Sequence, residues 1–246
     1  MRLDRFLCEM NLGSRSQVKS LVRQGFVTVN GSTVKSPDQQ VNELADRITC
    51  RGELLQYRKF VYYMMNKPSG VVSATSDGRE QTVISLLGKD AKDGIFPVGR
   101  LDKDTTGLLL LTDDGDLAHR LLSPRKHVDK AYRATIAHKL APEDIRRLEE
   151  GLDIGEEKPT LPARVTILGE REILLTLHEG KFHQVKRMLQ AVDNQVTSLK
   201  RVSFGGLNLD ENLREGEYRE LTEEELNKLS INMECRSDTL IKTKMP

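Results

Sequence analysis

The sequence predicts an α+β protein with a small helical domain that carries a β-hairpin, followed by a larger domain with a mixed, mainly antiparallel sheet and flanking helices. The 246 residues are 37% hydrophobic and 30% charged, which suits one or two globular domains and excludes wholesale disorder. Helical periodicity marks the N-terminal part, whereas the remainder has short β-like runs in quick succession. Because few helices separate these runs, antiparallel pairing is expected to dominate the sheet.

The first 55 residues carry the signals of two helices and a hairpin. Leu3–Met10 places its apolar side chains on one helical face, and a second helix is expected over Arg15–Gln24. Ser14–Gln17 has the spacing of a capping box, in which two side chains satisfy free backbone N–H groups at a helix start. Gly25 suits the end of that helix, and Asn30-Gly31 between alternating β-formers is the strongest short hairpin signal.

The larger domain is expected over residues 61–231, after a short linker at 56–60. Its expected strands are 61–66, 71–73, 94–98, 108–112, 131–137, 165–168, 173–177 and 195–204, and its expected helices are 117–122, 141–150 and 183–191. The acidic segment 113–116 is interpreted as a turn with an N-cap rather than as a cation site. Residues 232–246 lack periodicity and are expected to form a disordered tail.

The net charge of +1 conceals an uneven distribution. Residues 1–60 have ten Lys or Arg against six Asp or Glu, whereas residues 206–246 have six against ten. Local patches matter more than the total charge for binding phosphates. On charge alone, an RNA-binding surface and an ordinary solvated surface are equally compatible with this pattern.

Several classes of protein are disfavoured. The longest aliphatic run, Leu108–Leu111, is far shorter than the roughly 20 apolar residues of a membrane span. Charged residues directly after Met1 do not fit a secretory signal, so a cytoplasmic location is expected. Cys8, Cys50 and Cys235 are an odd, scattered set that fits neither a disulfide framework nor a zinc site.

The N-terminal motifs resemble the S4 RNA-binding domain. The matching segments, in order, are Arg2-Leu3-Asp4, Ser14-Arg15-Ser16, Gly25–Gly31, Val34 and Asp46-Arg47-Ile48. In that family two helices present basic side chains to structured RNA, and contacts to phosphates position the protein without reading sequence. The resemblance implies RNA contacts from Arg2, Arg5, Arg15, Lys19 and Arg23.

The larger domain resembles pseudouridine synthases, and within them the branch that carries an S4 domain and acts on ribosomal RNA. The most specific segment is 99–115, in which Gly-Arg-Leu-Asp-Lys-Asp-Thr-Thr-Gly precedes the leucine run. Four further segments agree in order, namely 65–70, 130–133, 179–189 and 216–221. The form of segment 179–189 is most similar to the enzymes that act on 16S rRNA of the small subunit.

The resemblance implies roles for three residues. Pseudouridine synthases break the N-glycosidic bond of a uridine and rejoin the same ring to the sugar through carbon. Asp102 matches the catalytic carboxylate, which either attacks covalently or abstracts a sugar proton to give a glycal. Tyr132 matches the aromatic residue that packs against the target base once this base has left the helix stack. Lys186 matches the cation that pairs with the carboxylate and fixes its direction.

Three charged residues lie close to Asp102 and Lys186 in the sequence and are expected to have other roles. Lys186 and Arg187 are adjacent on one expected helix, so their side chains point about 100° apart and only one can face the site. Lys186 is the expected partner of Asp102, and Arg187 is expected to face RNA or the domain surface. Arg100 is expected to be structural or to contact RNA. Asp104 lies two residues beyond the catalytic position of the pattern.

Nothing in the sequence indicates a cofactor or a metal. His178 and His183 lack a second ligand pair, and the other histidines form no triad pattern with Ser or Cys. A glycine-rich phosphate loop is also absent from the sequence. The expected chemistry is therefore an isomerisation that uses neither.

The sequence predicts an enzyme that converts a specific uridine of 16S rRNA to pseudouridine, with free RNA or a partly assembled small subunit as its partner. One alternative is a 23S rRNA pseudouridine synthase, and another is a non-catalytic S4-type RNA-binding or ribosome-assembly protein. Asp102, Tyr132 and Lys186 disfavour the latter, because a protein that only binds RNA has no need of all three. The sequence shows neither a coiled coil nor a large apolar stripe, so a monomer is expected.

Overall fold

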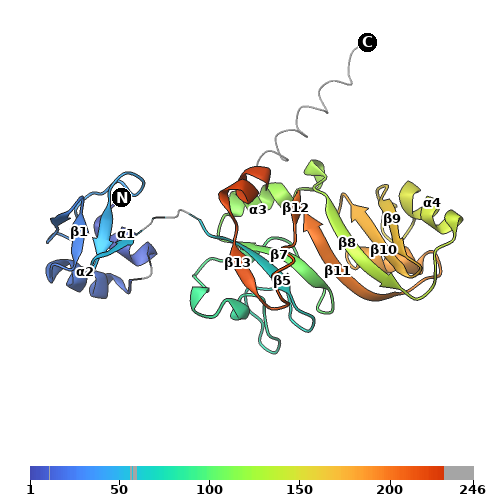
Figure 1. Ribbon diagram of the computed structural model, residues 1–246, viewed down its shortest axis with the longest axis horizontal. Helices are drawn as coiled ribbons and strands as arrows, with labels where there is room; N and C mark the ends of the chain where they lie inside the picture. Colours follow the sequence, from blue (N-terminus) through green and yellow to red (C-terminus); the bar gives the residue numbers. More distant parts are fainter. Residues whose placement is uncertain (11, 56, 58–59, 230–246) are drawn as a thin grey trace, which may run out of the picture. The chain divides into compact units, whose positions relative to one another are not determined.

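The chain forms two compact units that divide between residues 59 and 60 (Figure 1). The computed structural model describes residues 1–10, 12–55, 57 and 60–229. Part of the expected linker (56, 58 and 59) and the whole expected tail, 232–246, lie outside the described residues, and the domain limits 1–55 and 61–231 stay predictions. Among the described residues no helix has the length and apolar character to cross a membrane.

The N-terminal unit packs two helices on a four-stranded antiparallel sheet. Its elements are α1 (Leu3–Glu9), α2 (Arg15–Arg23), β1 (Val27–Val29), β2 (Ser32–Thr33), β3 (Ile48–Cys50) and β4 (Glu53–Leu55), with strand order β2-β1-β3-β4. Both expected helices and the hairpin are confirmed. The Ser14 N–H donates to Gln17 Oε1 at 2.8 Å, as a capping box requires.

The N-terminal unit has two tight hairpins, of which only the first was predicted from the sequence. Asn30 and Gly31 both have positive φ, 52° and 83°, as expected for a tight turn between β1 and β2. Arg51 and Gly52 repeat this geometry between β3 and β4, with φ of 53° and 87°. Arginine is not a typical residue for a left-handed position. The second hairpin was therefore not predicted.

The larger unit is built on a mixed sheet whose main strand order is β13-β5-β7-β11-β8-β10-β9. Its strands are β5 (Tyr62–Lys67), β6 (Phe96–Pro97), β7 (Thr106–Thr112), β8 (Lys130–Ile136), β9 (Arg164–Gly169), β10 (Glu172–Leu177), β11 (Val196–Phe204), β12 (Leu207–Asn208) and β13 (Tyr218–Glu220). Neighbours along this order are antiparallel except β7 and β11, which are parallel. The expected mixed, mainly antiparallel sheet is confirmed.

Helices accompany this sheet. They include α3 (Gly115–Leu122), α4 (Pro142–Glu150), α5 (Gln184–Gln190) and the 3-10 turns η1 (Ser85–Asp90) and η2 (Pro124–Lys126). Figure 1 shows α4 beside β9 at one end of the sheet and α3 near β12 toward the other. The expected N-cap is confirmed, because Asp114 accepts a hydrogen bond from the Leu117 N–H at 2.9 Å.

Some strand expectations were wrong. The expected strand over 94–98 is limited to β6, and residue 72 forms only an isolated bridge with residue 82. Strand β13 was not predicted, although it extends the sheet beyond β5. Its three residues are too few to show a period-two pattern.

Strands β5 and β7 are buried on both faces, which accounts for the apolar runs Tyr63–Met65 and Leu108–Leu111. One face contributes Met64, Leu108 and Leu110 to a core that includes Leu117 of α3. The opposite face contributes Met65, Leu109 and Leu111 to a core that includes Leu87 of η1. By contrast, β10 alternates buried and half-buried residues because a single face meets the third core of this unit.

The parallel contact between β7 and β11 joins the two halves of the sheet. Gly107 of β7 lies opposite Arg201 of β11. The φ angle of Gly107 is +102°. A Cβ at Gly107 would overlap the carbonyl oxygen of Arg201 and lie 2.8 Å from its backbone nitrogen. The two backbones can therefore pair here only because residue 107 is glycine.

We expect Gly107→Ala to lower the free energy of unfolding by about 2–4 kcal/mol, because the methyl group forces β7 and β11 apart and strains a positive φ. Urea denaturation of the full chain measures the change. Gly115→Ala is the matched control, since a Cβ at this helical position meets open space. Equal stability of the two variants would contradict the proposed steric constraint.

Candidate active site

A cavity of about 320 Å³ lies above the sheet, between the loop that precedes β7 and the segment that leads into α5. Asp102, Tyr132 and Lys186 all line it, together with Arg100. They come from the loop before β7, from strand β8 and from helix α5. The fold thus brings together three residues that are separated by up to 84 positions in sequence.

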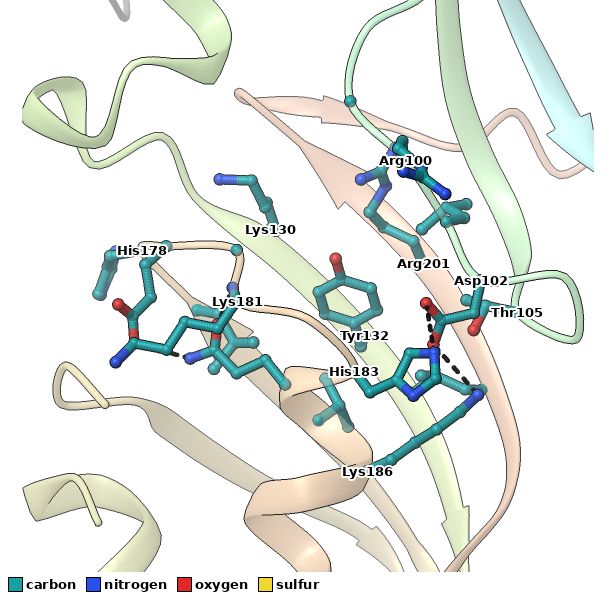
Figure 2. Close-up of a pocket in the computed structure, with 18 of the residues that line it drawn as sticks. Arg100, Asp102, Thr105, Lys130, Tyr132, His178, Lys181, His183, Lys186 and Arg201 are labelled. Carbon is teal, nitrogen blue, oxygen red and sulfur yellow. Dashed lines mark hydrogen bonds and ion pairs between the residues drawn. The ribbon is translucent and has the colours of Figure 1, made fainter. Parts of the chain in front are cut away.

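Asp102 lies between two cationic or potentially cationic side chains. Its Oδ2 is 3.1 Å from Lys186 Nζ, and its Oδ1 is 3.5 Å from His183 Nε2. Figure 2 shows the carboxylate facing both groups, with the Tyr132 ring nearby. The Asp102 side chain is 26% exposed, so a ligand in the cavity can still reach it.

Lys186 also contacts Asp104, which the sequence pattern placed outside the site. Lys186 Nζ donates to Asp104 Oδ1 at 2.6 Å. Burial lowers the pKa of Lys186, but the hydrogen bonds with Asp104 and Asp102 outweigh burial and raise the pKa overall. The same hydrogen bond lowers the pKa of Asp104. The Asp104 side chain is 68% exposed, so of the two carboxylates Asp102 is the more enclosed.

Tyr132 occupies the sheet beneath the cavity. It pairs with Arg201 of β11 on one side and with Leu175 of β10 on the other. Gly107, Arg201, Tyr132 and Leu175 therefore form one row across β7, β11, β8 and β10. The ring is half-buried and packs against two cores of the unit. A planar side chain in this position is fixed by the sheet.

Lys67, at the end of β5, anchors the loop that carries Asp102. Its Nζ donates to the carbonyl oxygens of Pro68, Lys103 and Thr105 at 3.0, 3.3 and 3.0 Å. The side chain is fully buried, and burial lowers its pKa to about 8. Lys67 belongs to the motif segment 65–70, and nothing in that segment indicates this contact.

Arg187 is directed away from Asp102 into the protein. Its Nη1 contacts Glu156 Oε1 at 2.5 Å and donates to the Phe182 carbonyl oxygen at 3.1 Å, while Nη2 donates to the Ile154 carbonyl oxygen. Lys186 is thus the member of the pair that reaches Asp102. These contacts do not favour the expected RNA-binding role of Arg187, because they engage its guanidinium with Glu156, Ile154 and Phe182 of the same chain.

Comparison with known proteins gives the family. Residues 61–191 match the RNA pseudouridylate synthase family, and residues 1–48 match the S4 domain. The chain belongs to the RNA pseudouridylate synthase family. The resemblance inferred from the motifs is confirmed, and so is the expected fold class.

Relatives match this synthase over almost the whole chain. The uncharacterised RNA pseudouridine synthase YtzG of Bacillus subtilis is 49% identical over 94% of this chain and 98% of its own. The ribosomal small subunit pseudouridine synthase A of Haemophilus influenzae is 43% identical over 93% of this chain and 99% of its own. A crystal structure of a pseudouridylate synthase superposes with a TM-score of 0.66 at 41% sequence identity. The match covers 93% of this chain and 99% of the chain in that structure.

Two further cations line the cavity of this synthase and were not singled out from the sequence. Arg201 is 2% exposed, and its Nε donates to the Leu108 carbonyl oxygen at 2.8 Å, across the β7–β11 contact. Lys130 donates to the Val128 carbonyl oxygen at 2.9 Å. Burial and the neighbouring Arg201 lower the pKa of Lys130 to about 8. The alternation of β8 places Lys130 and Tyr132 on one face, a signal that the sequence already contained.

The basic residues of the S4 domain fall into two groups. Arg2 forms two hydrogen bonds with Asp4, at 3.0 and 2.8 Å, and Arg5 pairs with Glu9 at 2.7 Å. Arg15, Lys19 and Arg23 follow one another at intervals of four along α2, and so share one face of the helix. Within the described part of the chain, no hydrogen bond or ion pair joins the side chains of these three to another residue. This α2 row therefore differs from Arg2 and Arg5, whose side chains are paired with carboxylates.

We expect Lys67→Met to destabilise the synthase by about 2–4 kcal/mol at pH 7, because three carbonyl groups lose their donor. The folded pKa of about 8 lies below the 10.5 of a free lysine, so the unfolded wild type binds more protons between these values. Wild-type stability therefore rises from about pH 8 to 10.5, and the gap to the variant widens. Urea unfolding at pH 7 and pH 10 measures both effects.

Lys103→Met is the control for this experiment, because Lys103 belongs to the same loop but forms an exposed pair with Glu80. Its effect on stability should stay within about 0.5 kcal/mol. If the gap between wild type and Lys67→Met closed toward pH 10, the assigned role of the buried lysine would be incorrect.

Proposed function

We propose that this synthase converts one uridine of 16S rRNA to pseudouridine, with Asp102 as the catalytic carboxylate. The observation that carries the proposal is the enclosed Asp102–Lys186 pair, 3.1 Å apart, in a cavity that Tyr132 also lines. Relatives named as ribosomal small subunit pseudouridine synthase A, at about 40% identity over most of the chain, support 16S rRNA as the substrate.

In the proposed reaction, the bond between the sugar C1′ and the uracil N1 breaks and a bond between C1′ and C5 forms. The base loses its C5 proton and gains a proton at N1, so the change is an isomerisation. Asp102 starts it either by attacking the sugar or by removing a sugar proton. Lys186 opposes the negative charge of Asp102 and holds the carboxylate toward the cavity.

Tyr132 is the proposed platform for the base. A uridine must leave the stacked RNA before a carboxylate can reach its sugar, and this exposes both faces of the ring to solvent. An aromatic side chain recovers roughly 1–3 kcal/mol of stacking per base. Because the sheet fixes Tyr132 beside Asp102, stacking would also keep the freed uracil in place while it turns (Figure 2).

The S4 domain is the proposed docking module. The α2 row would bind RNA phosphates and position the chain, whereas the cavity would select the uridine. Free 16S rRNA or a partly assembled small subunit is the proposed partner, and the enzyme is proposed to act in the cytoplasm as a monomer. Arg100, exposed at the cavity and without a hydrogen bond or ion pair to another described residue, is proposed to contact the same RNA.

In cells that lack this gene, we expect one pseudouridine to disappear from 16S rRNA, as mapped by carbodiimide labelling and primer extension across 16S and 23S rRNA. The wild-type gene should restore the site, and Asp102→Asn should not, because the amide cannot act as nucleophile or base. Asp104→Asn is the matched control. It also removes a carboxylate from Lys186, yet it should restore the modification.

The other outcomes separate the alternatives. Loss of a 23S site would retain the enzyme and change its substrate. Loss of no site would favour the non-catalytic RNA-binding protein. Restoration by Asp102→Asn, with Asp104→Asn inactive, would transfer the catalytic role to the neighbouring carboxylate.

A triple variant, Arg15→Gln, Lys19→Gln and Arg23→Gln, should weaken binding to a 16S rRNA transcript. Each lost phosphate contact removes counterion release, so the log–log slope of affinity against salt should fall by about 2. Filter binding at 50–200 mM salt measures it. The double variant Arg2→Gln, Arg5→Gln is the control with a smaller effect, since Asp4 and Glu9 already engage these side chains.

A further inference from the structure

The loop that joins β10 to α5 is braced by many internal contacts. Glu179 Oε1 accepts hydrogen bonds from the Leu161 N–H and from Gln184 Nε2, both at 2.8 Å. Gln184 Oε1 in turn accepts from the Lys181 N–H at 2.9 Å. Arg187 holds the Phe182 carbonyl oxygen from the other side. The backbone on both sides of Phe182 is therefore held in one conformation.

The braced loop nevertheless presents a large apolar side chain to solvent. The Phe182 side chain is 70% exposed, the largest exposed fraction of any aromatic residue among those the structure describes. Its ring stacks on the His183 imidazole, with centroids 3.8 Å apart and planes 20° apart. His183 has a left-handed backbone, with φ of 48°, which directs the chain sharply at this point. One face of the Phe182 ring is thus covered and the other is open.

The stacked pair continues directly from the candidate active site. His183 lines the cavity, and its Nε2 lies 3.5 Å from Asp102 Oδ1. The Phe182 ring therefore stacks directly on a residue that lies beside the Asp102 carboxylate. A phenylalanine this exposed gains little from hydrophobic burial, so folding alone does not account for an aromatic ring at this position.

We propose that Phe182, backed by His183, is a stacking platform for a nucleobase next to the target uridine. When the uridine leaves the stack, its neighbouring base loses a partner, and an open aromatic face offers a replacement without reading sequence. The cations that line the same cavity, including Arg100 and Lys186, favour a polyanionic strand over an apolar partner at this edge. This inference rests on the proposed RNA-modifying function and adds a second contact nucleotide.

Steady-state formation of pseudouridine in a 16S rRNA transcript tests the platform. Phe182→Ala should raise KM on the order of ten- to a hundredfold, the range of one lost base stack, with kcat nearly unchanged. Phe182→Tyr should restore KM, because it keeps the ring face. Phe182→Leu should not, although it keeps apolar volume. Leu168→Ala, at a half-exposed leucine of β9, is the control that should change neither constant.

A double-mutant cycle, which combines Phe182→Ala with an altered RNA, identifies the nucleotide that stacks on Phe182. Synthetic RNAs that contain the mapped uridine would carry an abasic nucleotide immediately 5′ or 3′ of it. For the wild-type enzyme, one of these two abasic RNAs should bind more weakly than the unaltered RNA, by the same factor that Phe182→Ala causes with the unaltered RNA. With Phe182→Ala, that abasic RNA should cause no further loss. Thermal unfolding midpoints of all variants should coincide, because the altered side chain is exposed.

Distinct outcomes would overturn the platform. An unchanged KM in Phe182→Ala would overturn it while leaving the proposed function intact. A fall in kcat with constant KM would instead assign Phe182 to the positioning of His183 and Asp102. A wild-type enzyme that forms no pseudouridine in 16S rRNA would refute the proposed function, and the wild-type reaction alone reveals that case.

Discussion

The parallel pairing of β7 with β11 is the contact on which the rest of the larger unit depends. Because the two strands run in the same direction, the Asp102 loop before β7 and helix α5 before β11 approach the same edge of the sheet. Lys186 can reach Asp102 only through this arrangement. Gly107 permits the close approach, since any side chain at this position would overlap the backbone of Arg201.

Cationic side chains donate hydrogen bonds to backbone carbonyl groups throughout the same region. Lys67 binds the carbonyl groups of the Asp102 loop, and Arg201 binds the Leu108 carbonyl group across the strand contact. Arg187 likewise donates a hydrogen bond to the Phe182 carbonyl oxygen in the loop between β10 and α5. Charged donors form stronger hydrogen bonds with carbonyl oxygens than neutral donors do. The loops around the candidate active site are therefore held by charge-assisted hydrogen bonds within the chain itself, which is the kind of support that a preorganised site needs.

The local structure was predictable where one short pattern determines it. The capping box at Ser14, the turn at Asn30-Gly31 and the N-cap at Asp114 were each anticipated, because the deciding interaction lies within a few residues. The turn at Arg51-Gly52 was missed, because the pairing of β3 with the distant strand β1 stabilises the hairpin despite the poor fit of arginine to a left-handed position. Three-residue strands such as β13 leave no periodicity to detect.

By itself the sequence determined the family, the mixed sheet and three residues of the cavity, Asp102, Tyr132 and Lys186. Each of these three residues lies in a short contiguous motif, which is why the sequence alone could reveal it. Only the tertiary structure decided how these residues share their contacts. It joined Asp104 to Lys186, gave Arg187 its partners Glu156, Phe182 and Ile154, and gave Lys67 its three carbonyl partners. These contacts link segments as many as 82 residues apart, and the direction of a side chain across such a distance depends on strand order and register, which no local pattern encodes.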